Sequence, residues 1–108
     1  MEKKYIGSAL KFNEERFTKI NVFKTIDCTV FVLNFLSGQK MPEHKHPGCE
    51  LYLNVLKGEG RFTVDGEEIS VTKDDVIHIG GDEMIGFLND SEAQVSIYVT
   101  MNRISQHQ

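Results

Sequence analysis

Short apolar stretches separated by frequent turn signals form the main pattern along the chain. The stretches between turns are mostly too short for helices and are rich in Val, Ile, Phe, Tyr and Thr, which favour strands. Many short strands spaced by turns predict an all-β antiparallel sandwich or small barrel. The turn signals are Ser37-Gly38, Pro47-Gly48, Gly58-Glu59-Gly60, Asp65-Gly66, Lys73-Asp74-Asp75, Gly80-Gly81 and Asn89-Asp90-Ser91.

A buried strand and a hairpin are the best-defined elements in this pattern. Segment 27–36, DCTVFVLNFL, is apolar at both alternations except Asn34, which predicts a strand covered on both faces. In RFTVDGEEISV, 61–71, the pair Asp65-Gly66 tolerates the positive φ angles of a type I′ turn, so we predict a hairpin. Further strands are expected in 75–79, 84–88 and 93–101. Segment 13–26 is ambiguous, because its first half suits a helical turn whereas FTKINVF, 17–23, favours a strand.

The chain length of 108 residues predicts a single domain, 1–108. We expect a short flexible segment at its N-terminus. The polar tail at 103–108, which includes His107, is expected to be disordered.

Charge and hydropathy argue against two classes of partner. The net charge is −4, and no cluster of Lys and Arg is long enough to follow a phosphate backbone, so we expect no nucleic acid partner. No stretch has the length and hydrophobicity of a signal peptide or a membrane span, which predicts a cytoplasmic protein without a membrane partner. In that compartment Cys28 and Cys49 are expected to be free thiols.

The stretch MPEHKHPGCEL, 41–51, gathers ligand-type side chains around a turn. Side chains alternate along a strand, so His44 and His46 share a face, with Cα atoms about 6.6 Å apart. Two imidazoles at that spacing can bind one ion of zinc, iron, copper or nickel. The alternative is a polar surface turn with both rings in solvent.

The length of the loop at Pro47-Gly48 decides which third group joins the histidines. With a two-residue loop, His46 faces Cys49 and Glu50 points away. With a three-residue loop, His46 pairs with Glu50, and two histidines and a carboxylate form the set used by non-haem iron sites. The local sequence leaves both registers open.

Segment 38–58 resembles the first motif of the cupins, G-x(5)-H-x-H-x(3,4)-E-x(6)-G. Gly38, His44, His46 and Glu50 fall on it, while the last spacing, to Gly58, is one residue too long, which a β-bulge would absorb.

Segment 65–89 resembles the second cupin motif, G-x(5)-P-x-G-x(2)-H-x(3)-N, with irregular spacing. Gly66 and Asn89 match its ends, its proline is missing, and its histidine position is Ile85.

The resemblance implies a cupin-type jelly roll in which the motifs hold a metal in a small β-barrel. Carried over to this chain, it implies a divalent transition metal (Fe, Mn, Zn, Ni or Cu) on His44, His46 and Glu50. His78 is a candidate fourth ligand. Residues expected to line the pocket are Tyr52, Asn54, Phe31, Phe35 and Ile85.

Three functional hypotheses follow from the resemblance. The first is a metal-dependent enzyme, dioxygenase- or isomerase-like, that acts on a small polar molecule. The alternative is a non-catalytic cupin that binds or senses a small ligand with weak or no metal binding. The third is a structural β-domain without metal. Small cupins are often dimers, so we expect a homodimer.

Overall fold

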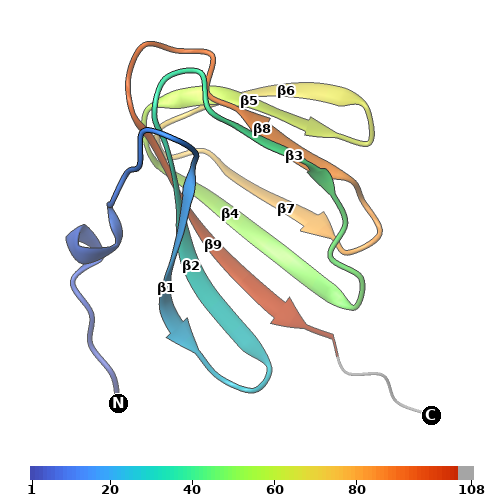
Figure 1. Ribbon diagram of the computed structural model, residues 1–108. Helices are drawn as coiled ribbons and strands as arrows, with labels where there is room; N and C mark the ends of the chain where they lie inside the picture. The colour runs from blue at the N-terminus through green and yellow to red at the C-terminus, as the bar shows by residue number, and fades with distance from the viewer. Residues whose placement is uncertain (105–108) are drawn as a thin grey trace.

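Two antiparallel sheets pack face to face as a jelly-roll sandwich in the computed structural model, which describes residues 1–104 (Figure 1). Within these residues, one sheet has the strand order β1-β2-β9-β4-β7 and the other β3-β8-β5-β6. The predicted fold class is therefore confirmed. The elements are η1 (Ile6–Ala9), β1 (Thr18–Lys24), β2 (Cys28–Phe35), β3 (Lys40–His44), β4 (Cys49–Lys57), β5 (Glu59–Val64), β6 (Glu67–Thr72), β7 (Val76–Gly80), β8 (Ile85–Leu88) and β9 (Val95–Arg103).

The strands predicted from local pattern correspond to strands of the structure. The ambiguous segment forms β1, so the preference of FTKINVF for a strand is confirmed. In β2, Val32 and Asn34 on one face and Phe31, Leu33 and Phe35 on the other are all buried, as expected for a strand covered on both sides. None of the helical segments in residues 1–104 has the length and hydrophobicity to cross a membrane.

The β5–β6 hairpin has the turn that its sequence predicts. Asp65 and Gly66 have φ angles of 50° and 83°, so both central residues are in the left-handed region that a type I′ turn requires. The pairing Val64↔Glu67 closes the loop at two residues.

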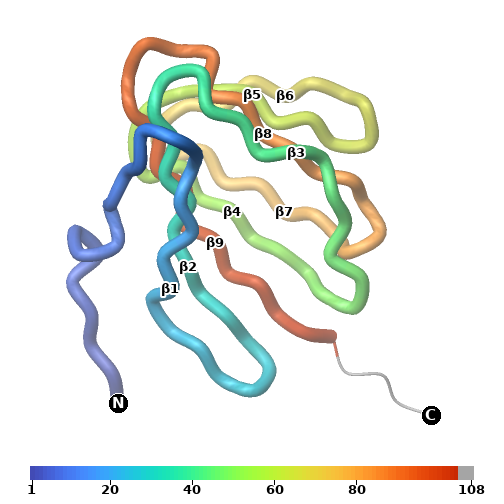
Figure 2. Tube along the Cα trace, viewed as in Figure 1, coloured from blue at the N-terminus to red at the C-terminus, as the bar shows by residue number. Residues whose placement is uncertain are grey.

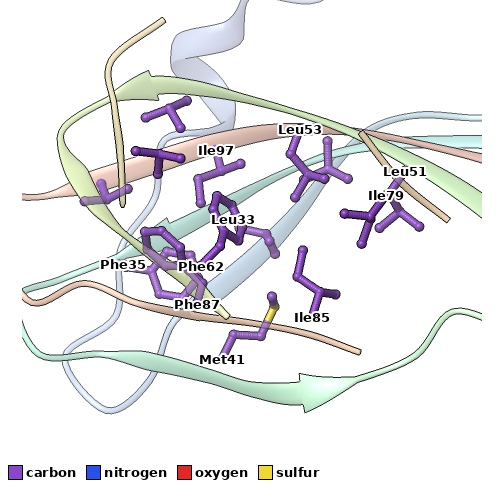
Figure 3. Close-up of a cluster of buried hydrophobic side chains, with 14 of the residues drawn as sticks. Leu33, Phe35, Met41, Leu51, Leu53, Phe62, Ile79, Ile85, Phe87 and Ile97 are labelled. Atoms are coloured by element: carbon purple, nitrogen blue, oxygen red, sulfur yellow. The ribbon is translucent and has the colours of Figure 1, made fainter. Parts of the chain in front are cut away.

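The hydrophobic core lies between the two sheets. It consists of the inward-facing side chains of both layers, and Figure 3 shows Leu33, Leu53, Ile85 and Met41 within it. Phe35 stacks on Phe17 and packs against the ring of Phe87, with ring centroids 5.1 and 4.8 Å apart. These contacts form an aromatic cluster within the core.

The segment between β3 and β4 crosses from one sheet to the other, as the tube in Figure 2 shows. β3 pairs with β8, whereas β4 pairs with β7 and β9. The turn at Pro47-Gly48 is present, because the N–H of Cys49 donates to the carbonyl of His46 at 3.1 Å. Both hairpin registers expected for this loop are nevertheless wrong, since the strands on its two sides do not pair.

The N-terminal segment is anchored to the outer face of the five-stranded sheet. Ala9 is buried, and its carbonyl accepts a hydrogen bond of 2.8 Å from the Nδ2 of Asn34. At the other end, Arg103 belongs to β9 rather than to a tail. The rest of the expected tail, with His107, lies outside the described residues apart from Ile104.

Candidate ligand-binding cavity

A cavity of about 350 Å³ lies between the sheets, where His44 and His46 meet the inner face of β4. Strands of both sheets contribute to its wall, together with Phe17 before β1 and His46 after β3. The lining residues are Phe17, Lys19, Phe31, Leu33, Met41, Pro42, His44, His46, Leu51, Leu53, Ile85 and Val99. Its volume falls within the range of roughly 300–1,000 Å³ that small-molecule sites occupy.

The floor of the cavity is apolar. Leu51, Leu53, Ile85 and Val99 are each at most 2% exposed, and Leu33 is 4% exposed. Leu51, Leu53 and Ile85 point into the interior in Figure 3. An apolar ligand group that displaces water from such a floor gains about 25 cal/mol per Å² of surface buried.

The mouth of the cavity carries its polar groups. Lys19 and Pro42 are exposed, and His44 and His46 are partly buried. Lys19 reaches the cavity because its register with Leu33 places it on the inner face of β1. Its Nζ lies 4.5 Å from the ring centroid of Phe31, a cation–π contact.

The two imidazoles lie edge to face, with ring centroids 4.5 Å apart. Their expected common face is thus observed. The Nδ1 of His44 is 2.8 Å from the carbonyl oxygen of Pro42. A carbonyl only accepts hydrogen bonds, so Nδ1 is the donor, and in a neutral ring Nε2 keeps its lone pair.

His46 has a lowered pKa. Burial is the main cause, and the nearby positive charges of His44 and Lys19 add to it. The ring is therefore mostly neutral at pH 7. A neutral imidazole offers one N–H donor and one acceptor to a ligand at the cavity mouth.

Glu50 lies on the opposite face of β4 from the cavity. Its neighbour Leu51 points inward, and strand alternation turns the carboxylate outward. Its Oε1 accepts hydrogen bonds from the hydroxyl of Tyr52 at 3.1 Å and from Nε2 of His78 at 3.2 Å. The expected convergence of Glu50 with His44 and His46 is therefore wrong.

His78 is also outside the cavity. It pairs across the sheet with Tyr52, and the two rings stack with centroids 4.8 Å apart. Its side chain is 52% exposed. The expectation that His78 supplies a fourth ligand beside the histidine pair is therefore also wrong.

Two of the five residues expected to line a pocket lie in the wall of this cavity. Phe31 and Ile85 line the cavity. Tyr52 and Asn54 share the outward alternation of Glu50, and Phe35 is buried in the aromatic cluster instead. Glu50, Tyr52 and Asn54 alternate along the same face of β4. A sequence register that places Glu50 in the cavity therefore places Tyr52 and Asn54 there as well.

Leu51 occupies the glutamate position of the first motif. The motif allows four residues between its second histidine and its glutamate, and that count leads from His46 to Leu51. The next spacing, from Leu51 to Gly58, is then the regular six residues. No bulge is needed to absorb an extra residue before Gly58, and the side chain that faces the histidines is an alkyl group.

The second motif is also regular when it is counted from Asp74 rather than from Gly66. Asp74 has a φ of 76°, the left-handed conformation that favours glycine, which is the residue the motif has there. The count then reaches Ile85 at the histidine position and Asn89 at the asparagine position without a gap. Ile85 pairs directly with His44 across β8 and β3.

The residues present do not fit the metal of the motif. Its four ligand positions hold two imidazoles and two aliphatic chains, at Leu51 and Ile85, and alkyl groups do not coordinate an ion. Within residues 1–104, no group of three or more His, Cys, Asp or Glu side chains is placed to hold a metal. The predicted three-ligand centre is not formed.

Lys19 and most residues of the floor were not predicted from the sequence. The alternation of FTKINVF places Phe17 and Lys19 on one face, and this signal could have identified both. Leu51 could have been found from the spacing to Gly58. Lining residues without such a signal include Met41, Leu53 and Val99.

Comparison with known proteins agrees with the fold. A family model described as a cupin domain matches residues 31–101. No curated protein matches the chain in sequence.

Solved structures resemble the whole domain. TT1209 from Thermus thermophilus has a TM-score of 0.90 at 24% identity, over 97% of this chain and 100% of that chain. An RmlC-like cupin protein from Desulfovibrio desulfuricans has a TM-score of 0.83 at 26% identity, over 94% of this chain and 96% of that chain. KdgF from Halomonas sp. has a TM-score of 0.73 at 19% identity, over 83% and 82% of the two chains.

Proposed function

This chain belongs to the cupin family, and from that premise we propose that it is a non-catalytic protein that binds a small molecule in its cavity without a resident metal. The observation that carries the proposal is the pair Leu51 and Ile85. Both line the cavity at positions where the motifs have ligands, so the residues that would hold an ion instead extend an apolar floor.

The lining favours binding over turnover. Within the described residues the polar groups of the cavity are Lys19, His44 and His46, all at the mouth, while the floor is aliphatic and aromatic. No carboxylate of this part of the chain lines the cavity beside the imidazoles to act as a partner in proton transfer. The dioxygenase- or isomerase-like activity expected from the sequence depended on Glu50, which has no access to this cavity.

The expected ligand is more apolar than the small polar molecule predicted from the sequence. A sugar-like molecule would leave hydroxyl groups unpaired against the floor, at a cost of about 1–3 kcal/mol for each buried group. A small apolar molecule suits this cavity, because its volume of about 350 Å³ lies within the range of small-molecule sites. A cytoplasmic location, with Cys28 and Cys49 as free thiols, remains part of the proposal.

Binding of neutral apolar probes tests this function. In buffer that contains a chelator, 1-hexanol and benzyl alcohol should bind wild-type protein by isothermal titration calorimetry. Ile85→Phe should weaken the binding several-fold, because its ring extends farther into the cavity than the isoleucine side chain and reduces the space left for a ligand. Ile77→Phe changes a partly buried isoleucine that packs on the core but does not line the cavity, and this variant should bind as wild type does.

Failure of both probes to bind wild-type protein at millimolar concentration would refute the function. Equal affinity in Ile85→Phe and wild-type protein would place the binding elsewhere and refute it as well. Circular dichroism melts of both variants would show that each is folded.

A further inference from the structure

We infer that the ligand is a small monocarboxylate with an apolar tail, whose carboxylate binds at Lys19. The inference rests on the proposed function and specifies its ligand class. It follows from the distribution of charge around the cavity, from the position of Lys19, and from the composition of the floor.

The charge at the cavity mouth has the opposite sign to that of the whole chain. The chain has 16 acidic and 12 basic residues and a net charge of −4. Among the described residues that line the cavity, however, no acidic residue occurs and Lys19 is the permanently charged group. A cationic mouth on an acidic protein attracts anions locally and repels cations.

Lys19 is held at the mouth but keeps its ammonium group available. Its side chain lies over Phe31, a lining residue, with Nζ 4.5 Å from the ring centroid. None of the carboxylates within residues 1–104 forms an ion pair with it. An ammonium group at the edge of an apolar site can bind a carboxylate by a charge-assisted hydrogen bond.

The histidines can complete the recognition of a carboxylate. His44 and His46 line the same mouth as Lys19. The N–H of a neutral His46 ring can donate to one carboxylate oxygen while Lys19 binds the other.

The floor restricts the ligand to a single charged end. Beyond the mouth, the cavity is lined by Leu33, Leu51, Leu53, Ile85 and other apolar side chains. A second carboxylate would be buried there without a partner, whereas an alkyl or aryl tail gains from being removed from water. In a fatty or aromatic monocarboxylate, the carboxylate would bind at the charged mouth and the tail would pack on the apolar floor.

A matched set of ligands tests the carboxylate. Calorimetry at pH 7.5 would compare hexanoate, hexanamide and hexylamine, which differ in the head group. For wild-type protein we expect hexanoate to bind at least tenfold more tightly than hexanamide, and hexylamine to bind most weakly.

Two lysine variants test the position of the charge. In Lys19→Met, which keeps an unbranched side chain over Phe31, hexanoate should lose its advantage, so the ratio of the hexanoate and hexanamide affinities should fall to about one. Lys24→Met is the matched control, because Lys24 lies on the same strand but lines a different pocket. It should retain the full preference for hexanoate.

The outcomes separate this inference from the function on which it rests. Equal binding of hexanoate and hexanamide to wild-type protein would overturn the inference and leave the binding function intact. If Lys19→Met and Lys24→Met lost the preference for hexanoate equally, the preference would depend on the overall charge of the protein. That result would also overturn the inference. If neither compound bound, both the inference and the proposed function would be refuted.

Discussion

At the scale of single residues, Leu51 and Ile85 determine the chemistry that the cavity can support. Each is buried and lines the cavity beside the histidine pair. A carboxylate and an imidazole at these positions would complete the four-ligand set of the cupin motifs. Two alkyl chains instead remove half of the coordination and make the surroundings of His44 and His46 apolar.

Restoring both ligands should create metal binding. In Leu51→Glu/Ile85→His, we expect close to one zinc or nickel ion per chain by inductively coupled plasma mass spectrometry, and a melting temperature that rises on metal addition. Wild-type protein should contain far less metal after the same chelator-free purification. Without metal the variant should be less stable than wild type, because it buries a carboxylate.

Leu51→Gln/Ile85→His is the matched control, since it has the same shape without the carboxylate charge, and it should bind metal much more weakly. Stoichiometric metal in wild-type protein would contradict the inference that Leu51 and Ile85 prevent metal binding at the histidine pair.

His46 should titrate below the ordinary histidine pKa of 6.5. Burial is the main cause, so Lys19→Met should raise this pKa only in part. An NMR titration of the His46 Cε1–H signal measures both values. A pKa at or above 6.5 in wild-type protein would show that the ring is more solvated than its position indicates.

The same shift has a consequence for stability. Because folding lowers this pKa, the unfolded state takes up the proton first as the pH falls through 6.5. The contribution of a neutral His46 is therefore fully present above pH 6.5 and is lost at lower pH. The effect should be small, since the ring is only partly buried. Chemical denaturation at pH 7.5 and 5.5 should show this loss in wild-type protein and not in His46→Asn.

At the residue scale, the sequence identified the histidine pair but misplaced its third partner. The alternation in β4 has a period of two, so reading the motif one residue short moves Glu50 from the cavity to the outer face. The motif itself allowed both spacings. Only the strand's inward face, which depends on packing against the other sheet, distinguishes Leu51 from Glu50.

At the scale of elements, glycines with positive φ set the turns, and their surroundings decide the cost of replacing them. Gly66→Ala should lower the free energy of unfolding by about 1 kcal/mol, because a φ of 83° is strained for alanine. No steric cost is added, since the new Cβ would meet no atom within 4 Å. Gly58→Ala should cost about 2–4 kcal/mol, since its Cβ would lie 2.3 Å from the carbonyl oxygen of Gln94.

Urea denaturation of the two variants measures the difference. The two glycines have nearly the same φ, so Gly66→Ala serves as the control for backbone strain in Gly58→Ala. Equal costs would mean that Gln94, which precedes β9, can move away from residue 58 at little energetic cost, contrary to the packing observed.

The crossing between β3 and β4 is the element that the sequence did not predict. A Pro-Gly turn between two strand-like segments normally indicates a hairpin, because the signal is local. Here the N–H of His46 donates to the carbonyl of Gly81 at 3.2 Å, and a Cβ on Gly81 would lie 2.2 Å from the carbonyl oxygen of His46. The loop after β7 thus holds the turn that carries His46, a contact between segments far apart in the sequence.

At the scale of the whole molecule, the all-β sandwich was predictable because strand alternation and turn residues are local signals. Its jelly-roll form was expected from the resemblance to the cupins. The content of the cavity was not, since its wall combines residues from both sheets. Lys19 from β1 and Ile85 from β8 meet around one space only after the sheets pack. The fold could therefore be predicted with its strands, whereas the site required the contacts between layers.

The assembly state remains a prediction from the family resemblance. We expect a homodimer, and sedimentation-equilibrium ultracentrifugation should give twice the chain mass of 12.3 kDa. A single species at the chain mass across the micromolar range would contradict this expectation.

The proposed function requires that the apolar cavity binds a small molecule directly, without a metal. Methyl carbon-13 NMR of wild-type protein, titrated with 1-hexanol in the presence of a chelator, tests it most directly. We expect shift changes concentrated at the methyl groups of Leu33, Leu51, Ile85 and Val99, with the exposed Ile26 and Val76 unchanged. Unchanged cavity methyl signals at millimolar hexanol, or changes that require added metal, would contradict it.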